Sequence, residues 1–302
     1  MLLRSTALFF LGLLAACGDV KKSDLNGWIS NIKFTGGLRM ERAPSDAPVD
    51  AATLIRNFRK IAYELESNPF GYGPGAPRQE GRSMLKRWES DVHMQIVWDE
   101  ESAAGPADDT IAFARKLSDL TGVPLKVSQH EQVSTDLPDA DNVNFFVFLG
   151  TGEFFENMLA ELKAPLVGDD EEMAEVSSGF LEFFAIWHRS YSPCAAQSYS
   201  ETSDAGDTGR IFLAFVAIRT DLQDPMTQSC IEEELAQSMG LMNDDKDVRP
   251  SLFNDDHEFA LLTNHDELLL KVLYDARLTA GMSAPQSMPI VRQIARELLP
   301  DD

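Results

Sequence analysis

The chain has 302 residues, of which 44% are hydrophobic, and its 49 acidic and 26 basic residues give a formal net charge of −23. This composition is typical of a globular protein, long enough for one large domain or two small ones. Such an acidic surface repels phosphate groups, which argues against a nucleic-acid partner and against charge-driven binding to anionic lipid headgroups.

The first residues have the three parts of an export signal. Residues 1–4 carry one positive charge, and residues 7–14 form an apolar run too short to span a bilayer. Small residues, Ala15 and Ala16, come directly before Cys17, and this pattern resembles the lipobox of bacterial lipoproteins. The resemblance implies that residues 1–16 are removed as a signal peptide and that Cys17 is acylated. Each buried methylene of the lipid contributes about 0.8 kcal/mol, so several acyl chains would anchor the protein durably. An ordinary signal peptide that happens to contain a cysteine is the alternative.

Cleavage before Cys17 would place the mature chain in the bacterial cell envelope, facing the periplasm. It removes one arginine and no acid, which changes the net charge from −23 to −24. Gly18 follows the cysteine and Asp19 comes one position later, an order that favours the outer membrane by the sorting preference of enteric lipoproteins. The expected partners are therefore the lipid bilayer and an envelope protein, and not nucleic acid.

The mature chain begins with a segment that lacks a long apolar period. We expect residues 17–48 to be the lipidated N-terminus and a tether, with one short strand over residues 28–34. A helix should begin at Asp50, because apolar residues from Leu54 to Leu65 recur at helical spacing.

Two continuous apolar runs, at residues 142–149 and 211–218, are typical of strands buried on both faces of a sheet. The other elements are predicted from helical spacing, from strand alternation or from polar and glycine-rich composition. In chain order they are a loop over 67–77, a strand over 88–98, helices over 108–121 and 153–162, an acidic loop over 169–172, a flexible polar segment over 198–209, and helices over 229–240, 265–274 and 288–299. This alternation predicts a single α/β (or α+β) domain over residues 49–302, with a twisted mixed sheet backed by helices.

Export to an oxidising compartment would also favour disulfide formation by the other cysteines. Only Cys194 and Cys230 remain after Cys17, an even pair in an oxidising compartment, so we predict that they form a disulfide. Closing a loop of that span stabilises the fold by roughly 3–4 kcal/mol in the chain-entropy treatment. Two free thiols are the alternative.

One segment contains residues that could take part in catalysis or in metal binding. Residues 229–244 have the spacing of the active-site helix of metzincin-type zinc proteases, HExxHxxGxxH, which they resemble. In that motif two histidines bind zinc, the glutamate between them activates water, and a glycine turns the chain toward a third ligand. The corresponding residues, in motif order, are Glu233, Glu234, Gln237, Gly240 and Asn243. The general-base position is thus occupied by Glu234.

The motif spacing is retained, but its zinc ligands are not. Glutamate, glutamine and asparagine offer only oxygen atoms, which suit calcium or magnesium better than zinc. All five histidines of the chain stand singly, without a second histidine at ligand spacing. We therefore expect no cofactor. The alternative is a divalent metal ion bound by Glu233, Gln237, Asn243 and Asp244.

The same segment also has a purely structural interpretation. Ser229 and Glu232 have the spacing of a capping box at a helix start, and Gly240 matches an ordinary helix end. Ile231 and Leu235 would then belong to a core-facing stripe. Both interpretations predict a helix here, and they differ in whether its acids bind a ligand.

A wider resemblance covers most of the mature chain. Residues 230–282 look like a family of bacterial lipoproteins of unknown function. The runs that carry this resemblance are residues 233–244, 250–255, 262–266, 273–278 and 281–282, with 57–63 and 86–88 upstream. The family implies no activity, and the metzincin resemblance implies a metzincin-like layout of the domain.

We therefore expect a membrane-anchored envelope lipoprotein whose protease-like domain is degenerate and serves for binding or scaffolding. The alternative is a peptidase-like hydrolase in which Glu234 is the general base beside an unconventional metal site. A third hypothesis is an inhibitor or adaptor of an envelope enzyme. The sequence leaves open whether the protein is an enzyme.

Overall fold

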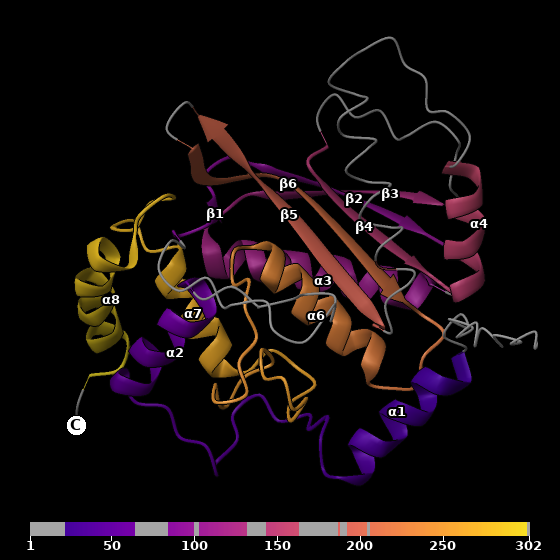
Figure 1. The fold of residues 1–302 in the computed structure, drawn as a ribbon, viewed down its shortest axis with the longest axis horizontal. Helices are drawn as coiled ribbons and strands as arrows, with labels where there is room; N and C mark the ends of the chain where they lie inside the picture. Colours follow the sequence, from indigo (N-terminus) through magenta and orange to yellow (C-terminus); the bar gives the residue numbers. More distant parts are fainter. Residues whose placement is uncertain are drawn as a thin grey trace, which may run out of the picture.

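A computed structural model of the protein describes residues 22–63, 84–99, 103–131, 143–162, 187, 192–203 and 206–300. In these residues the chain forms a mixed α/β fold, with a mostly parallel sheet of six strands and seven helices (Figure 1). The fold class expected from the sequence is confirmed. The signal peptide, Cys17 and the loops predicted over 67–77 and 169–172 lie outside the described residues.

The sheet consists mainly of parallel strands. Its strands are β1 (Arg87–Trp88), β2 (Val92–Trp98), β3 (Leu125–Glu131), β4 (Phe145–Gly150), β5 (Cys194–Ser203) and β6 (Gly206–Arg219). Strands β3, β2, β4 and β6 follow one another in this order, and β5 pairs antiparallel with β6. Ile211 of β6 pairs with Ser200 of β5 on one edge and with Trp88 of β1 on the other. The short β1 therefore shares an edge of β6 with β4.

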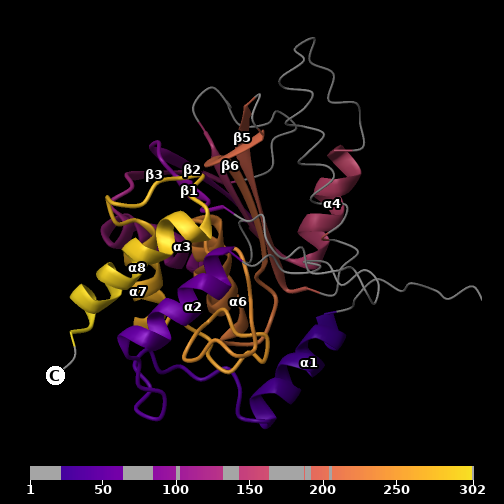
Figure 2. The same cartoon turned by 60° about the vertical axis from the view of Figure 1, so that its left-hand side comes forward.

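The helices are distributed over both faces of the sheet. They are α1 (Lys22–Phe34), α2 (Ala51–Tyr63), α3 (Ala104–Thr121), α4 (Gly152–Leu162), α6 (Met226–Ser238), α7 (Asn264–Leu273) and α8 (Ala284–Leu298). Helices α3 and α6 cover one face, with α2, α7 and α8 beyond them, and α4 lies on the opposite face (Figure 2). Of the helices that the structure describes, none is both long and apolar enough to cross a membrane.

Alternate residues of the central strands enter two separate cores. In β4, Phe145 belongs to the large core shared with α2, α3, α6, α7 and α8, whereas Phe146 packs in a smaller core with Phe155 of α4. Burial on both faces explains why the runs at 142–149 and 211–218 are continuously apolar, since each buried large side chain stabilises the fold by about 1.5–3 kcal/mol. Both strand predictions are confirmed.

The strand predicted over residues 28–34 is wrong, because these residues belong to helix α1. Leu25, Ile29 and Ile32 recur three or four residues apart and are buried, which is the period of a helix with one apolar face. Leu38, beyond the helix, is buried as well. Much of the segment expected as a tether thus packs against the rest of the chain.

The flexible segment predicted over residues 198–209 is also wrong where the structure describes it. These residues form most of β5 and the beginning of β6, which pair as an antiparallel ladder. The edge strand β3 was not predicted at all. Strands at the edge of a sheet are half exposed and accept polar side chains, so neither β3 nor β5 shows the apolar run of a central strand.

The remaining elements were predicted with shifted ends. The run expected as one strand over 88–98 is divided between β1 and β2. Helix α3 begins four residues before the predicted position, and α6 begins at Met226 instead of Ser229. The helices predicted over 153–162, 265–274 and 288–299 are confirmed as α4, α7 and α8.

Candidate functional site

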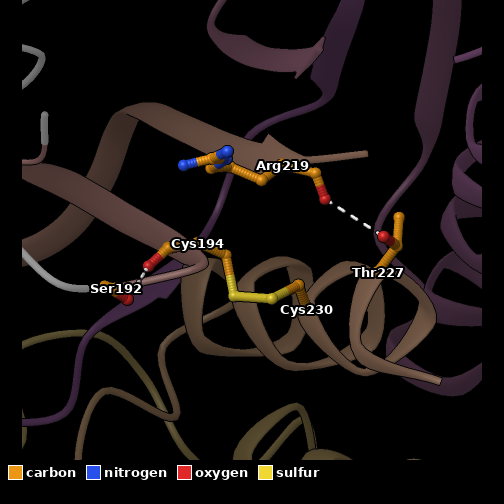
Figure 3. The surroundings of a disulfide bond; sticks show 5 residues. All are labelled: Ser192, Cys194, Arg219, Thr227 and Cys230. Atoms are coloured by element: carbon orange, nitrogen blue, oxygen red, sulfur yellow. Dashed lines mark hydrogen bonds between the residues drawn. A yellow bond between two sulfur atoms is a disulfide. The ribbon is translucent and has the colours of Figure 1, made fainter. Parts of the chain in front are cut away.

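Helix α6, which carries the motif residues, is fixed to both strands of the β5–β6 ladder. Cys230 forms a disulfide with Cys194, the first residue of β5, and their Cα atoms are 5.8 Å apart (Figure 3). The Thr227 hydroxyl donates a hydrogen bond of 3.0 Å to the carbonyl of Arg219, the last residue of β6. The predicted disulfide is confirmed, and the start of α6 is anchored at two points.

Three of the motif residues, Glu233, Glu234 and Gln237, belong to α6, on or beside the face that Cys230 turns toward β5. Residues four and seven positions apart share a helix face, so Glu234 and Gln237 belong to this side. Glu234 is buried, while Glu233 and Gln237 are partly exposed. The helix thus presents a polar strip next to an edge strand.

Gly240 ends this strip with a turn that only glycine can form without strain. Its φ angle is +113°, and a Cβ atom there would lie 2.1 Å from the carbonyl oxygen of Lys86. The turn brings the chain back to α6, where the Gln237 amide donates a hydrogen bond of 3.0 Å to Oδ1 of Asp244. Two of the candidate ligands are therefore in direct contact.

Asn243 does not join them. Its side-chain amide donates a hydrogen bond of 3.1 Å to the carbonyl of Lys60 in α2, and the residue is buried. Asn243 and Asp244 are neighbours in the chain but turn to different helices. The structure brings together Gln237 and Asp244 and directs Asn243 to α2.

Asp245 and Asp247, which follow in the chain, both form ion pairs with Lys60. Nζ of Lys60 lies 2.8 Å from Oδ1 of Asp245 and 3.0 Å from Oδ2 of Asp247. Burial lowers the pKa of Lys60, but hydrogen bonds to these two carboxylates outweigh it and raise the pKa above its usual value. Asp245, the neighbour of the candidate ligand Asp244, is therefore already in an ion pair.

The side chains of this site offer a few oxygen atoms as possible ligands for a cation. Gln237 and Asp244 could contribute oxygens to a hard cation, with Glu234 one turn earlier on the same side of α6. In the parts of the chain that the structure describes, no three or more His, Cys, Asp or Glu side chains are grouped so as to hold a metal ion. Any cation would depend on amide oxygens, which are weak ligands.

Sequence reasoning missed the principal role of Glu232. Both of its carboxylate oxygens accept hydrogen bonds from the guanidinium of Arg42, at 2.6 and 2.7 Å, and one also accepts from the backbone N–H of Leu262 at 2.8 Å. The capping box proposed for Ser229 and Glu232 is not formed, because α6 begins three residues earlier and Ser229 is buried inside the helix. Arg42 and Glu232 are 190 positions apart, so no local sequence pattern indicates that they form a pair.

His265 likewise acquires partners only in the fold. The residue is buried, with Nε2 3.2 Å from the Asn57 amide nitrogen and Nδ1 3.5 Å from Oδ1 of Asp266. Asp266 caps the start of α7 and accepts a hydrogen bond from the backbone N–H of Thr263. This network joins α2 to α7 inside the core, where it is closed to a substrate.

Comparison with known protein families gives a match over most of the chain. The family model described as "Protein of unknown function (DUF2927)" matches residues 51–293, a range that includes every motif residue of α6 and the turn after it. No curated protein matches the chain.

Proposed function

The chain belongs to the DUF2927 family, whose function is unknown, and from this premise we propose that it is a membrane-anchored lipoprotein of the bacterial envelope with a binding or scaffolding role. The lipobox-like run at residues 14–17 supports the anchor. The hydrogen bonds of the motif residues in α6 and the turn after it support the non-catalytic role, for a domain that we propose to be a degenerate metzincin-like one.

The observation that carries this proposal is the separation of the motif side chains. The Gln237 amide is directed at Asp244, whereas the Asn243 amide is directed at a carbonyl of α2. A metal-activated hydrolase needs its ligands to converge on one point with an open position for water. Here the same residues join α6, the following turn and α2, which is a structural role within the fold and favours a binding or scaffolding protein over a hydrolase.

The anchor is tested by Cys17→Ser. We expect the wild-type protein in the membrane fraction and the variant in the soluble periplasmic fraction, because the acyl chains supply the membrane affinity. Cys194→Ser is a control for the loss of a cysteine, since it breaks the disulfide but leaves the lipid in place, and it should remain in the membrane fraction. A wild-type protein recovered in the soluble fraction, or one whose Cys17 carries no acyl chain by mass spectrometry, contradicts the anchor.

A peptidase-like hydrolase is the second candidate, and one observation favours it. Glu234 lies one turn before Gln237 on the side of α6 that faces β5, and the Gly240 turn returns Asp244 to this side. These positions would serve a general base beside a hard cation.

Metal analysis separates the two candidates. For a scaffold we expect no stoichiometric metal in the purified, untagged protein, and equal rates of casein cleavage for the wild type and Glu234→Gln. One bound metal ion per chain, together with a cleavage rate that Glu234→Gln abolishes, supports the hydrolase and contradicts the scaffold. An inhibitor or adaptor would instead be revealed by an envelope enzyme recovered with the protein from membranes.

A further inference from the structure

A basic groove lies between helices α2 and α8. Its volume is about 570 Å³, and it is lined by residues of these two helices alone. Ile55, Pro285 and Met288 contribute apolar surface, while Arg56, Arg59 and Arg292 contribute guanidinium groups. We call this feature the α2–α8 groove. Its size is in the range of ligand-binding pockets.

The three arginines of the groove present exposed guanidinium groups. Within the described ranges, none of Arg56, Arg59 and Arg292 forms an ion pair, and all three are exposed. Elsewhere, Arg249 and Arg277 each bind two carboxylates. In a chain with 49 acids and 26 basic residues, a groove lined by cations and by no acid is an exception to the prevailing charge.

The basic surface continues along α8. Arg292 also lines an adjoining hollow of about 520 Å³, together with Arg296 one helical turn further on. The acid of this hollow, Glu297, is already bound to Arg277 at 2.7 Å. The cations therefore form an elongated row, longer than a single small anion requires.

Buried contacts between helices α2 and α8 fix the two sides of the groove. The Tyr63 hydroxyl at the end of α2 is hydrogen-bonded to the Ser287 hydroxyl in α8, and burial raises the pKa of Tyr63 to about 12. Phe58 and Val291 of the two helices are fully buried in the same core. A site whose walls are fixed loses little conformational entropy when it binds, which favours affinity.

We propose that the α2–α8 groove binds an acidic, amphipathic peptide segment of a partner protein. Carboxylates of the segment pair with Arg56, Arg59 and Arg292, because the planar guanidinium matches the carboxylate in a bidentate geometry. Apolar side chains of the segment lie on Ile55 and Met288. The inference rests on the proposed binding function and names the chemistry of its partner.

The position of the groove favours a peptide over a lipid surface. Helices α8 and α1 lie at opposite ends of the molecule in Figure 1 and remain apart in Figure 2. The proposed lipid anchor precedes α1, so the groove lies far from the end that the anchor holds. A flat anionic membrane would also meet other parts of a chain whose net charge is −23, whereas a single peptide meets the groove alone.

The test uses the full-length protein in detergent and three labelled ten-residue peptides. The first has glutamate and leucine at helical spacing, the second has glutamine in place of each glutamate, and the third has serine in place of each leucine. We expect saturable binding of the first peptide in fluorescence anisotropy, about tenfold weaker binding of the other two, and a loss of affinity as salt is raised.

Charge reversal locates the site. We expect Arg56→Glu and Arg292→Glu each to weaken binding of the first peptide about tenfold. Arg115→Glu is the matched control, because Arg115 is exposed on α3, outside the groove, and its replacement changes the net charge equally. Its affinity should equal that of the wild type.

Three results overturn the proposal. They are no saturable binding of the glutamate–leucine peptide, an equal effect of Arg115→Glu, and a groove that binds phosphatidylglycerol vesicles through Arg292 but not the peptide. None of them affects the Cys17→Ser fractionation or the metal analysis. A failure of the groove proposal is thus distinguishable from a failure of the proposed function.

Discussion

At the scale of single residues, one added methyl group at Gly240 has a predictable effect on stability. The positive φ angle and the Lys86 carbonyl, 2.1 Å from the position of a Cβ atom, both oppose a side chain. We expect Gly240→Ala to lower the free energy of unfolding by about 2–4 kcal/mol. Urea unfolding measures this change.

Gly27→Ala is the control for that variant. Gly27 lies inside α1, and a Cβ there meets nothing within 4 Å. Alanine at a free helical position should raise the free energy of unfolding by about 0.5–1 kcal/mol. If the two variants were equally stable, the close approach at Gly240 would not be the cause.

His257 gives the fold a pH dependence with a definite sign. Burial lowers the pKa of His257 below its usual value, although the nearby Asp255 and Asp256 raise it. A base whose pKa is lower in the folded state stabilises the fold above its unfolded pKa, and this contribution is lost as the pH falls through the folded pKa. Stability should therefore decrease on acidification below about pH 6.5.

The variant His257→Asn tests this pH dependence. Asparagine tolerates the positive φ angle of 50° at this position and does not titrate. We expect the loss of stability between about pH 7 and pH 5 to become shallower in urea unfolding at several pH values. An unchanged slope in His257→Asn would contradict the assignment.

At the scale of elements, the disulfide is the strongest single constraint on α6. It joins residues 36 positions apart and closes a loop that contains the whole of β6. We expect the double variant Cys194→Ala and Cys230→Ala to lose about 3–4 kcal/mol of unfolding free energy, because the unfolded chain regains the entropy of the open loop.

Reductant provides the control for the disulfide variant. It should destabilise the wild type by a similar amount and leave the double variant unchanged. A wild type that is insensitive to reductant under unfolding conditions would show that the bridge contributes nothing to stability.

The elements that could be predicted are those whose pattern is local. Helix α2 has Leu54, Phe58 and Ile61 on one buried face, and β4 is apolar throughout because both of its faces are covered. In contrast, β3 and β5 are edge strands, and their partly exposed side chains give no such pattern. Helix α1 was missed because its apolar stripe is narrow and lies among polar residues.

At the scale of the whole molecule, the N-terminal segment belongs to the folded unit although the family match begins after it. Arg42 is the main partner of the buried Glu232, and Leu25 and Ile29 are buried. We expect a chain that begins at Val49 to be less stable by about 3–5 kcal/mol or more, since it leaves a carboxylate buried without its cation.

A chain that begins at Gly18 is the matched control for this truncation. It lacks the lipid but retains α1 and Arg42, so its urea midpoint should equal that of the full-length protein. Equal midpoints for the chains that begin at Gly18 and at Val49 would show that the segment acts as a tether alone.

The sequence by itself determined what depends on neighbours in the chain or on simple counting. Two cysteines after Cys17 allow one disulfide, and the periods of apolar residues predict the central strands and most helices. Only the tertiary structure decided that Glu232 binds Arg42, that Asn243 turns away from Asp244, and that α2 and α8 together form a basic groove. The reason is physical: ion pairs and grooves join side chains from distant segments, and a one-dimensional pattern carries no record of which segments pack together.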